Sequence, residues 1–198
     1  MDDVTKQSIS SKVQGFDFIL HDLCLNKDWC EVRSCLKIFD TTAKVPRSGD
    51  LPLHLALSMG CPLDVAEALM KAFPDAATIP SSHNQFPLLL AMGVENAIYS
   101  NDFLTSLINP ESARGLNRLG ETALMSSISR KFPVSIVKAL LTANPDAVKE
   151  PDEMDDLPLH VAVNVGDEEV IKVIYEAYPD AAMIENGSCE LVEGFWTA

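Results

Sequence analysis

A motif that recurs along the chain places the strongest constraint on its fold. The sequence Leu-Pro-Leu-His occupies residues 51–54 and occurs again at residues 157–160. Two more segments lie between them in step, because Pro52, Pro87, Ala123 and Pro158 are separated by 35, 36 and 35 residues. An active site is built once, whereas a stacking unit is built many times. A period of this length therefore indicates a repeat array.

A second anchor follows each of these positions after about 22 residues, in the segments "FPDAA", "NPESA", "NPDAV" and "YPDAA". Proline is well tolerated at the first position of a helix, so each first anchor is expected to open a short helix. The second anchor, by contrast, is expected to end a second helix. Each period therefore predicts a helix–turn–helix unit.

The second helix of each unit has apolar residues on one face. Val65, Ala68, Leu69 and Ala72 follow the i, i+3, i+4, i+7 spacing of an amphipathic helix. Helices of about ten residues are too short to be stable alone in water, so each unit must bury this face against its neighbours. The fold predicted is an all-α solenoid of about five stacked helix–turn–helix repeats, joined by short loops that we call fingers.

A degraded copy precedes the four clear ones, since "LHDLCLNKDWCEVRSCLKIFDTTA" aligns with "LHLALSMGCPLDVAEALMKAFPDAA". A terminal repeat has one neighbour only, so its sequence is expected to differ from the others. We expect a flexible N-terminus over residues 1–15 and either a cap or a truncated sixth repeat over residues 188–198. The array between them is predicted to consist of repeats 16–46, 47–82, 83–117, 118–153 and 154–187.

The opening "xPLHxA" resembles that of the ankyrin repeat, which usually begins T-P-L-H-x-A, and "GETAL" at residues 120–124 resembles it too. The "YPDAA" endings depart from the family and resemble a variant subclass. The resemblance implies that the motif histidine makes local hydrogen bonds and that the preceding threonine caps the first helix, although only Thr122 keeps that hydroxyl. The residues expected to have these structural roles are Pro52, His54, Pro87, Thr122, Pro158 and His160.

The chain is acidic, and the charge is unevenly distributed. The net charge is −14, and residues 150–198 hold thirteen Asp and Glu against one Lys. Such a field repels nucleic acids and anionic membranes and favours basic partners, although it equally suits a solvated end that keeps a protein soluble. Five cysteines without a CxxC pair, and no signal sequence, favour an intracellular location, either cytoplasmic or nuclear.

Motifs that would indicate catalysis or metal binding are missing from the sequence. It has no glycine-rich phosphate loop, no HExxH, no GxSxG and no EF-hand spacing. The acidic run Glu150–Asp156 lacks the glycine of a calcium loop, and His54 and His160 lie far apart in the array. We therefore expect no enzyme, no metal and no cofactor.

The sequence favours a monomeric, non-catalytic module that binds a protein or peptide, which is the role that the resemblance implies for the concave surface of fingers and first helices. The alternatives are a structural spacer, a fragment of a larger signalling protein and, least favoured, a metal- or thiol-dependent enzyme. His83 lies in a polar connector and is either solvated or in contact with a partner. The residues expected to bind are Asp50, Gln85, Glu121 and Asp156 in the fingers, and Ser58, Met59, Val94, Ser129, Arg130, Asn164 and Val165 in the first helices.

Overall fold

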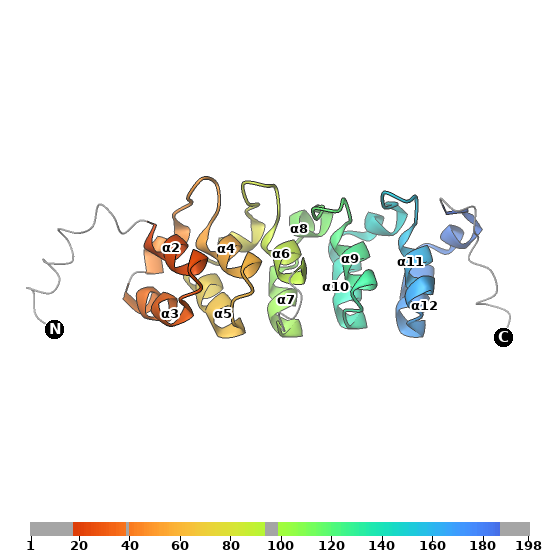
Figure 1. The fold of residues 1–198 in the computed structure, drawn as a ribbon. Coiled ribbons are helices and arrows are strands. Elements are labelled where there is room, and N and C mark those ends of the chain that lie inside the picture. Colours follow the sequence, from red (N-terminus) through yellow and green to blue (C-terminus); the bar gives the residue numbers. More distant parts are fainter. Residues whose placement is uncertain (1–17, 39, 94–98, 187–198) are drawn as a thin grey trace, which may run out of the picture. The chain divides into compact units, whose positions relative to one another are not determined.

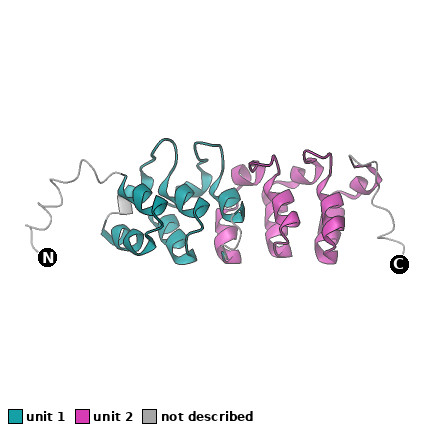
Figure 2. Cartoon of the chain, in the orientation of Figure 1, with its two compact units in different colours: residues 1–99 teal, residues 100–198 magenta. Residues whose placement is uncertain are grey.

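The computed structural model describes residues 18–38, 40–93 and 99–186. The chain forms two compact units, residues 1–99 and residues 100–198, and the boundary falls inside the third predicted repeat (Figure 2). Three predictions lie outside the described residues, namely the flexible segment 1–15, the cap or sixth repeat at 188–198, and the site residue Val94. The described residues contain no strand, only the isolated bridges Arg47–Asp50 and Leu116–Thr122.

Unit 1 consists of two helix pairs and one further first helix (Figure 1). First helices α2, α4 and α6 lie next to one another in that order, and second helices α3 and α5 pack side by side. Each second helix is followed by a 3₁₀ helix. The bounds are α2 (Ile19–Leu25), α3 (Trp29–Ile38), η2 (Asp40–Lys44), α4 (Pro52–Ser58), α5 (Leu63–Ala72), η3 (Pro74–Thr78) and α6 (Pro87–Gly93).

Unit 2 repeats the same plan, with α9 packed on α11 and α10 packed on α12. Its first element, α7, is a short second helix, and α8 replaces the 3₁₀ helix that follows it in the other repeats. The bounds are α7 (Asn101–Leu107), α8 (Pro110–Arg114), α9 (Ala123–Ser129), α10 (Val134–Ala143), η4 (Pro145–Lys149), α11 (Pro158–Val165), α12 (Glu168–Ala177) and η5 (Pro179–Met183).

The anchors act at the helix ends as predicted. Pro52, Pro87 and Pro158 each occupy the first position of a first helix, where the missing N–H has no intrahelical partner. The second helices α5, α10 and α12 each end two residues before the second-anchor proline, and that proline opens the 3₁₀ helix. The all-α repeat fold predicted from the sequence is confirmed, and the 3₁₀ turn is the element that the pattern did not predict.

The core of each unit is formed by the apolar faces of its stacked helices. In unit 1, Leu53, Leu57 and Leu69 are at most 2% exposed, and in unit 2, Leu124, Ile136 and Leu140 are at most 1% exposed. Burying a leucine or isoleucine contributes about 1.5–3 kcal/mol, so a few such residues per repeat outweigh the weak intrinsic stability of the helices.

The motif histidines join each first helix to the chain that leads to the next repeat. The Leu51 N–H donates to Nδ1 of His54 (2.9 Å), and Nε2 of His54 donates to the Ile79 carbonyl (2.8 Å). His160 repeats this arrangement with the Leu157 N–H (3.0 Å) and the Ile184 carbonyl (2.9 Å). Because Nδ1 accepts in both cases, each ring is a neutral imidazole protonated at Nε2.

At the one described first helix preceded by a threonine, Thr122, that residue caps the helix directly. The Thr122 hydroxyl accepts a hydrogen bond from the Met125 N–H at 3.2 Å. Leu51 and Leu157 occupy the same position in the histidine repeats, and both side chains are buried, at 2% and 6% exposed. The lost cap is therefore offset by apolar burial and by the histidine hydrogen bond.

We expect His54→Leu to lower the free energy of unfolding by about 1–3 kcal/mol. Leucine is the residue that the third repeat has at the equivalent position, Leu89. The substitution keeps the site apolar and filled, but it leaves the Leu51 N–H and the Ile79 carbonyl without the imidazole. Urea unfolding followed by circular dichroism measures the change. Ser58→Ala, at the exposed end of the same helix, should change stability by less than about 0.5 kcal/mol.

The same variant tests the protonation state of the ring. Burial lowers the pKa of His54 below the ordinary value of 6.5. Its contribution to stability is therefore complete above pH 6.5 and is lost as the pH falls through the pKa of the folded state. Between pH 7.5 and 5.5 the wild type should lose more stability than His54→Leu, and equal losses would contradict the assignment of a neutral imidazole.

Candidate functional site

Three fingers share one five-residue turn. They are finger 2 (residues 81–85), finger 3 (117–121) and finger 4 (152–156). In each, the N–H of the first residue donates to the carbonyl of the fifth residue at 2.9–3.0 Å. The fourth N–H returns to the first carbonyl at 2.9–3.1 Å. The fingers therefore have the same backbone although their sequences, SSHNQ, NRLGE and DEMDD, share almost no residue.

The first side chain of each finger holds this turn. Ser81 Oγ, Asn117 Oδ1 and Asp152 Oδ1 each accept hydrogen bonds from the third and fifth N–H groups of their finger, at 2.8–3.3 Å. The fourth residue has a positive φ, which is +57° in Asn84, +73° in Gly120 and +61° in Asp155. These three residue types adopt the left-handed region most readily. The fold of a finger therefore depends on its first and fourth residues, and the second and third are left free to vary.

Finger 1 (residues 47–50) is a tighter, two-residue turn, with Ser48 and Gly49 both at positive φ. It packs closely on finger 2, because a Cβ atom at Gly49 would lie 3.2 Å from Cβ of Ser82. Asp50 connects the two fingers: its Oδ1 accepts from the Ser82 N–H (2.8 Å), and its carbonyl accepts from Nε2 of His21 (2.8 Å). Asp50 thus has a structural role that the sequence did not predict.

The site residues expected in unit 1 differ in their exposure to solvent. Ser58 is exposed at the end of α4, and Met59 and Asp50 are half-buried. Gln85 is buried, at 8% exposed, unlike the other expected site residues of unit 1 that the structure describes. The reason is its place in the turn, since it is the last residue of finger 2 and leads the chain back into the core at Phe86 and Pro87.

In unit 2, the helix-end residues expected to bind lie at the surface. Ser129, Arg130 and Asn164 are exposed, and Val165 is half-buried. Glu121 is half-buried and accepts a hydrogen bond from Nδ2 of Asn117 at 2.7 Å, within its own finger. Asp156 is also half-buried. The fifth residues of fingers 3 and 4 are therefore half-buried, and the Glu121 side chain also supports its own finger.

The sequence analysis missed two exposed apolar residues at the third position of fingers 3 and 4. Leu119 is 60% exposed and Met154 is 76% exposed, and His83 holds the same position in finger 2. Their spacings of 36 and 35 residues match the repeat. An alignment of the three fingers would have located them. Each finger has Ser, Asn or Asp at its first position and Asn, Gly or Asp at its fourth, and all of these residues favour turns.

Carboxylates surround the apolar tip of finger 4. Asp152, Glu153, Asp155 and Asp156 belong to the finger, Glu150 precedes it, and the segment 150–156 contains no Lys or Arg. Glu153 also lies against finger 3, since a Cβ atom at Gly120 would be 3.1 Å from its Oε1. Fingers 3 and 4 of unit 2 therefore lie together and both have an apolar tip, with most of the acidic residues on finger 4 and one base, Arg118, on finger 3.

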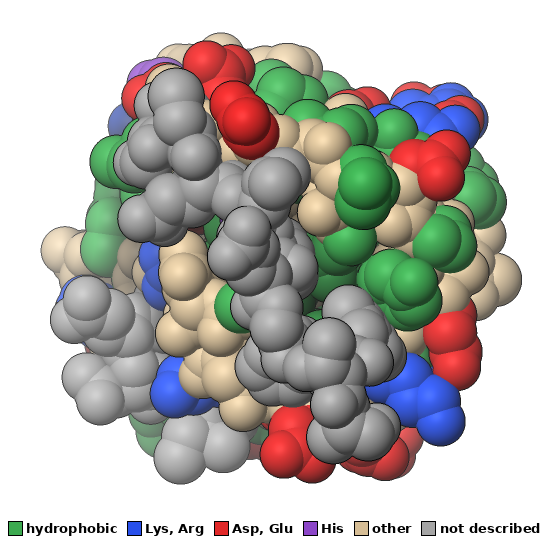
Figure 3. Space-filling model, turned by 90° about the vertical axis from the view of Figure 1, so that its right-hand side faces the viewer, with side chains coloured by type: hydrophobic (Ala, Val, Ile, Leu, Met, Phe, Trp, Pro, Cys, Tyr) green, Lys and Arg blue, Asp and Glu red, His purple; other side chains and the backbone are tan. Residues whose placement is uncertain are grey.

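A second exposed apolar group lies at the end of unit 2, where Met183 is 81% exposed and Ile184 is 39% exposed. Hydrophobic side chains gather on this end face among acidic and basic ones (Figure 3). Both residues follow the last described helix pair, where a further repeat would stack. No residue in the described part of the chain covers them, and they do not belong to the fingers.

The described residues hold no cluster of metal ligands, and three of their four cysteines are buried. No group of three or more His, Cys, Asp or Glu in this part of the chain could hold a metal ion. Burial raises the pKa of Cys24 to about 12 and that of Cys61 to about 11, and it also raises the pKa of Cys35. Thiols of this kind are poor nucleophiles near neutral pH because the thiolate is scarce. No helix in the described part of the chain is long and apolar enough to cross a membrane.

Comparison with known proteins identifies the repeats. A family model of ankyrin repeats, in three copies, matches residues 90–185. Among solved structures, the chain resembles a chain in the structure of the Bdellovibrio bacteriovorus predatory endopeptidase Bd0816 in complex with immunity protein Bd3460. The TM-score is 0.61 and the sequence identity is 14%, and the match covers 87% of this chain and 86% of that chain. At that identity the likeness shows the fold alone. No curated protein matches the chain.

We expect Asp155→Gly to raise the free energy of unfolding by up to about 1 kcal/mol, because glycine adopts the positive φ of this position without strain, as Gly120 does in finger 3. Thermal and urea unfolding measure the gain. Asp155→Asn removes the same charge but keeps a side chain, so the difference between the two variants isolates the backbone contribution. A glycine variant less stable than the wild type would contradict the role given to this position.

We also expect one fast thiol in the folded chain once Cys189, which lies outside the described residues, is changed to serine. Cys30 is exposed, whereas Cys24, Cys35 and Cys61 are buried. Titration with a disulfide reagent at pH 8 should therefore modify one thiol quickly in the folded protein and four in urea. Fast modification of two or more thiols before unfolding would refute this account.

Proposed function

We propose that this chain is a non-catalytic protein-interaction module that binds its partner on the finger side, because a family model of ankyrin repeats matches residues 90–185. Ankyrin repeats generally mediate protein–protein interaction. The binding surface proposed in unit 2 consists of fingers 3 and 4 and the C-terminal ends of α9 and α11. It includes Glu121, Ser129, Arg130, Asp156, Asn164 and Val165, together with Leu119 and Met154.

The pair of exposed apolar tips carries this proposal. Leu119 and Met154 hold equivalent positions in successive fingers and are 60% and 76% exposed, although nothing in the turn requires an apolar residue there. Finger 2 has the polar His83 at the same position. Apolar side chains on a rigid turn, beside charged groups, are typical of residues that anchor a partner.

The charge of this surface selects the partner. With five carboxylates and no base over residues 150–156, finger 4 favours Lys and Arg and disfavours acidic chains, whereas Arg118 and Arg130 lie elsewhere on the proposed surface. We therefore infer a protein or peptide that combines basic residues with at least one large apolar side chain. In unit 1, Asp50, Ser58 and Met59 are proposed as a smaller contact, and buried Gln85 is left out of it.

A peptide-display selection against the purified chain tests the proposal. Selected peptides should be enriched in Lys or Arg next to Leu, Ile, Met or an aromatic residue. Binding of a selected peptide, measured by fluorescence anisotropy, should weaken at least about tenfold in Glu153→Lys with Asp155→Lys, because reversing two charges at a contact costs more than about 1 kcal/mol. Leu119→Ser with Met154→Ser should weaken it by a similar factor.

The matched control is Glu176→Lys with Asp180→Lys, which makes the same charge change at exposed positions on α12 and η5. This control should retain wild-type affinity. If the finger variants bind as tightly as the control, the surface assignment is wrong. If selection yields no specific peptide, the chain fits the alternative role of a structural spacer.

A further inference from the structure

Unit 1 contains a hollow between its two second helices, α3 and α5. Both helices lie on the side of the unit away from its fingers (Figure 1). Its volume is about 410 Å³, which is within the range of sites that accept ligand groups. It is lined by Arg33, Leu36 and Lys37 of α3 and by Ala68, Lys71 and Ala72 of α5.

Helical periodicity explains why these residues meet. The lining residues lie at i, i+3 and i+4 on each helix, so each set forms one face, and α3 packs beside α5. Ala68 and Ala72 have small side chains, and they line the hollow together with Leu36, which is only 9% exposed. The hollow therefore has an apolar floor and an open mouth, because Lys37 and Lys71 are exposed.

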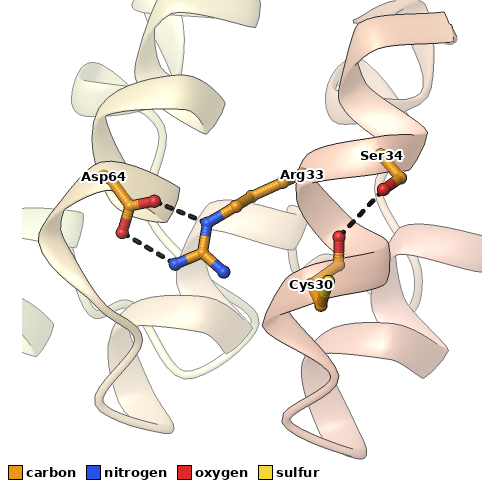
Figure 4. Close-up of polar contacts among 4 residues, drawn as sticks. All are labelled: Cys30, Arg33, Ser34 and Asp64. Atoms are coloured by element: carbon orange, nitrogen blue, oxygen red, sulfur yellow. Dashed lines mark hydrogen bonds and ion pairs between the residues drawn. The ribbon is translucent and has the colours of Figure 1, made fainter.

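Three cations surround this floor, and one of them is held in place. Nε and a terminal nitrogen of Arg33 donate to the two carboxylate oxygens of Asp64, at 2.5 and 2.9 Å, in a bidentate ion pair that joins α3 to α5 (Figure 4). Lys37 and Lys71 form no ion pair with the described side chains. The site therefore has two cations more than carboxylates, in a chain whose net charge is −14.

Stacking alone does not require this composition, as the equivalent positions of unit 2 show. Helices α10 and α12 begin 105 residues after α3 and α5, respectively, so the matching positions are read directly from the sequence. Thr142 replaces Lys37, Glu176 replaces Lys71, and the larger Val173 replaces Ala68. Counted over the same positions, with Glu169 in place of Asp64, the equivalent pair of helices carries one cation, Lys138, and two carboxylates.

We propose that the hollow between α3 and α5 is a second docking site, which binds an acidic amphipathic segment of a partner protein. Asp or Glu side chains of that segment pair with Lys37 and Lys71, and an aliphatic side chain between them enters the hollow over Leu36. This partner is opposite in charge to the one proposed for the fingers, and the inference does not depend on the finger site.

The apolar floor favours a peptide over a simple anion. Exposed ion pairs contribute only about 0–1 kcal/mol each, so two lysines alone would hold phosphate weakly. Covering an apolar floor adds about 25 cal/mol for each Å² removed from water, a gain that only a ligand with an aliphatic group can make. Both features are present at one site, which is the reason for specifying an acidic and amphipathic segment.

Selection of displayed peptides that carry Asp or Glu around a central Leu or Ile, against the full chain, tests this proposal. Anisotropy should show at least about tenfold weaker binding of a selected peptide to Lys37→Glu with Lys71→Glu. It should show weaker binding also to Ala68→Phe, which fills the hollow without changing charge. Circular dichroism confirms that each variant is folded. If Ala68→Phe does not fold, Ala68→Val takes its place, because unit 2 has valine at the equivalent position, Val173.

Two controls separate this site from others. Lys138→Glu with Lys172→Glu makes the same charge change at exposed positions of α10 and α12 and should leave binding unchanged. The finger variant Glu153→Lys with Asp155→Lys should also leave it unchanged, so failure here is distinct from failure of the finger site. Equal binding by the Lys37 and Lys71 variant and the wild type overturns the proposal. Competition by millimolar inorganic phosphate as effective as by the peptide overturns it too, since the site would then bind anions only.

Discussion

The length of the helices is the constraint on which this structure depends. The described helices have at most ten residues, too few to be stable in water without tertiary contacts. Each helix pair must therefore cover its apolar face with a neighbour, and the units form by stacking. The histidine hydrogen bonds act within this scheme: by tying Leu51 to Ile79 and Leu157 to Ile184, they fix the path from one repeat to the next.

Much of the fold could be predicted from the sequence because its determinants are local. Pro52 and Pro158 open helices, and Thr122 caps one, through interactions that span three or four residues. The 3₁₀ helices and the finger turns were missed because they depend on hydrogen bonds such as those of Asn117 and Asp152, which no hydrophobic period reveals. The burial of Gln85 was not predicted for a related reason, since a polar residue at a loop end need not face solvent.

The two candidate sites differ in how far the sequence could lead to them. The acidic run at residues 150–156 is contiguous, so it is visible without a structure, although its apolar tip became meaningful only when Leu119 was found at the same turn position. The hollow in unit 1 is assembled from two helices 34 residues apart, and Ala68 and Ala72 were interpreted only as core. A hollow between packed helices forms where the side chains of both facing surfaces are too small to fill the space. The sequence of one helix alone does not show this.

The self-bonded finger has a consequence for how such a chain diversifies. Since Ser81, Asn117 and Asp152 satisfy the turn from its first position, and a residue tolerant of positive φ completes it at the fourth, the intervening pair has almost no part in holding the backbone. Natural selection can exchange those two side chains at small cost to folding. Recognition can therefore change from one lineage to another while the architecture that presents it is inherited intact.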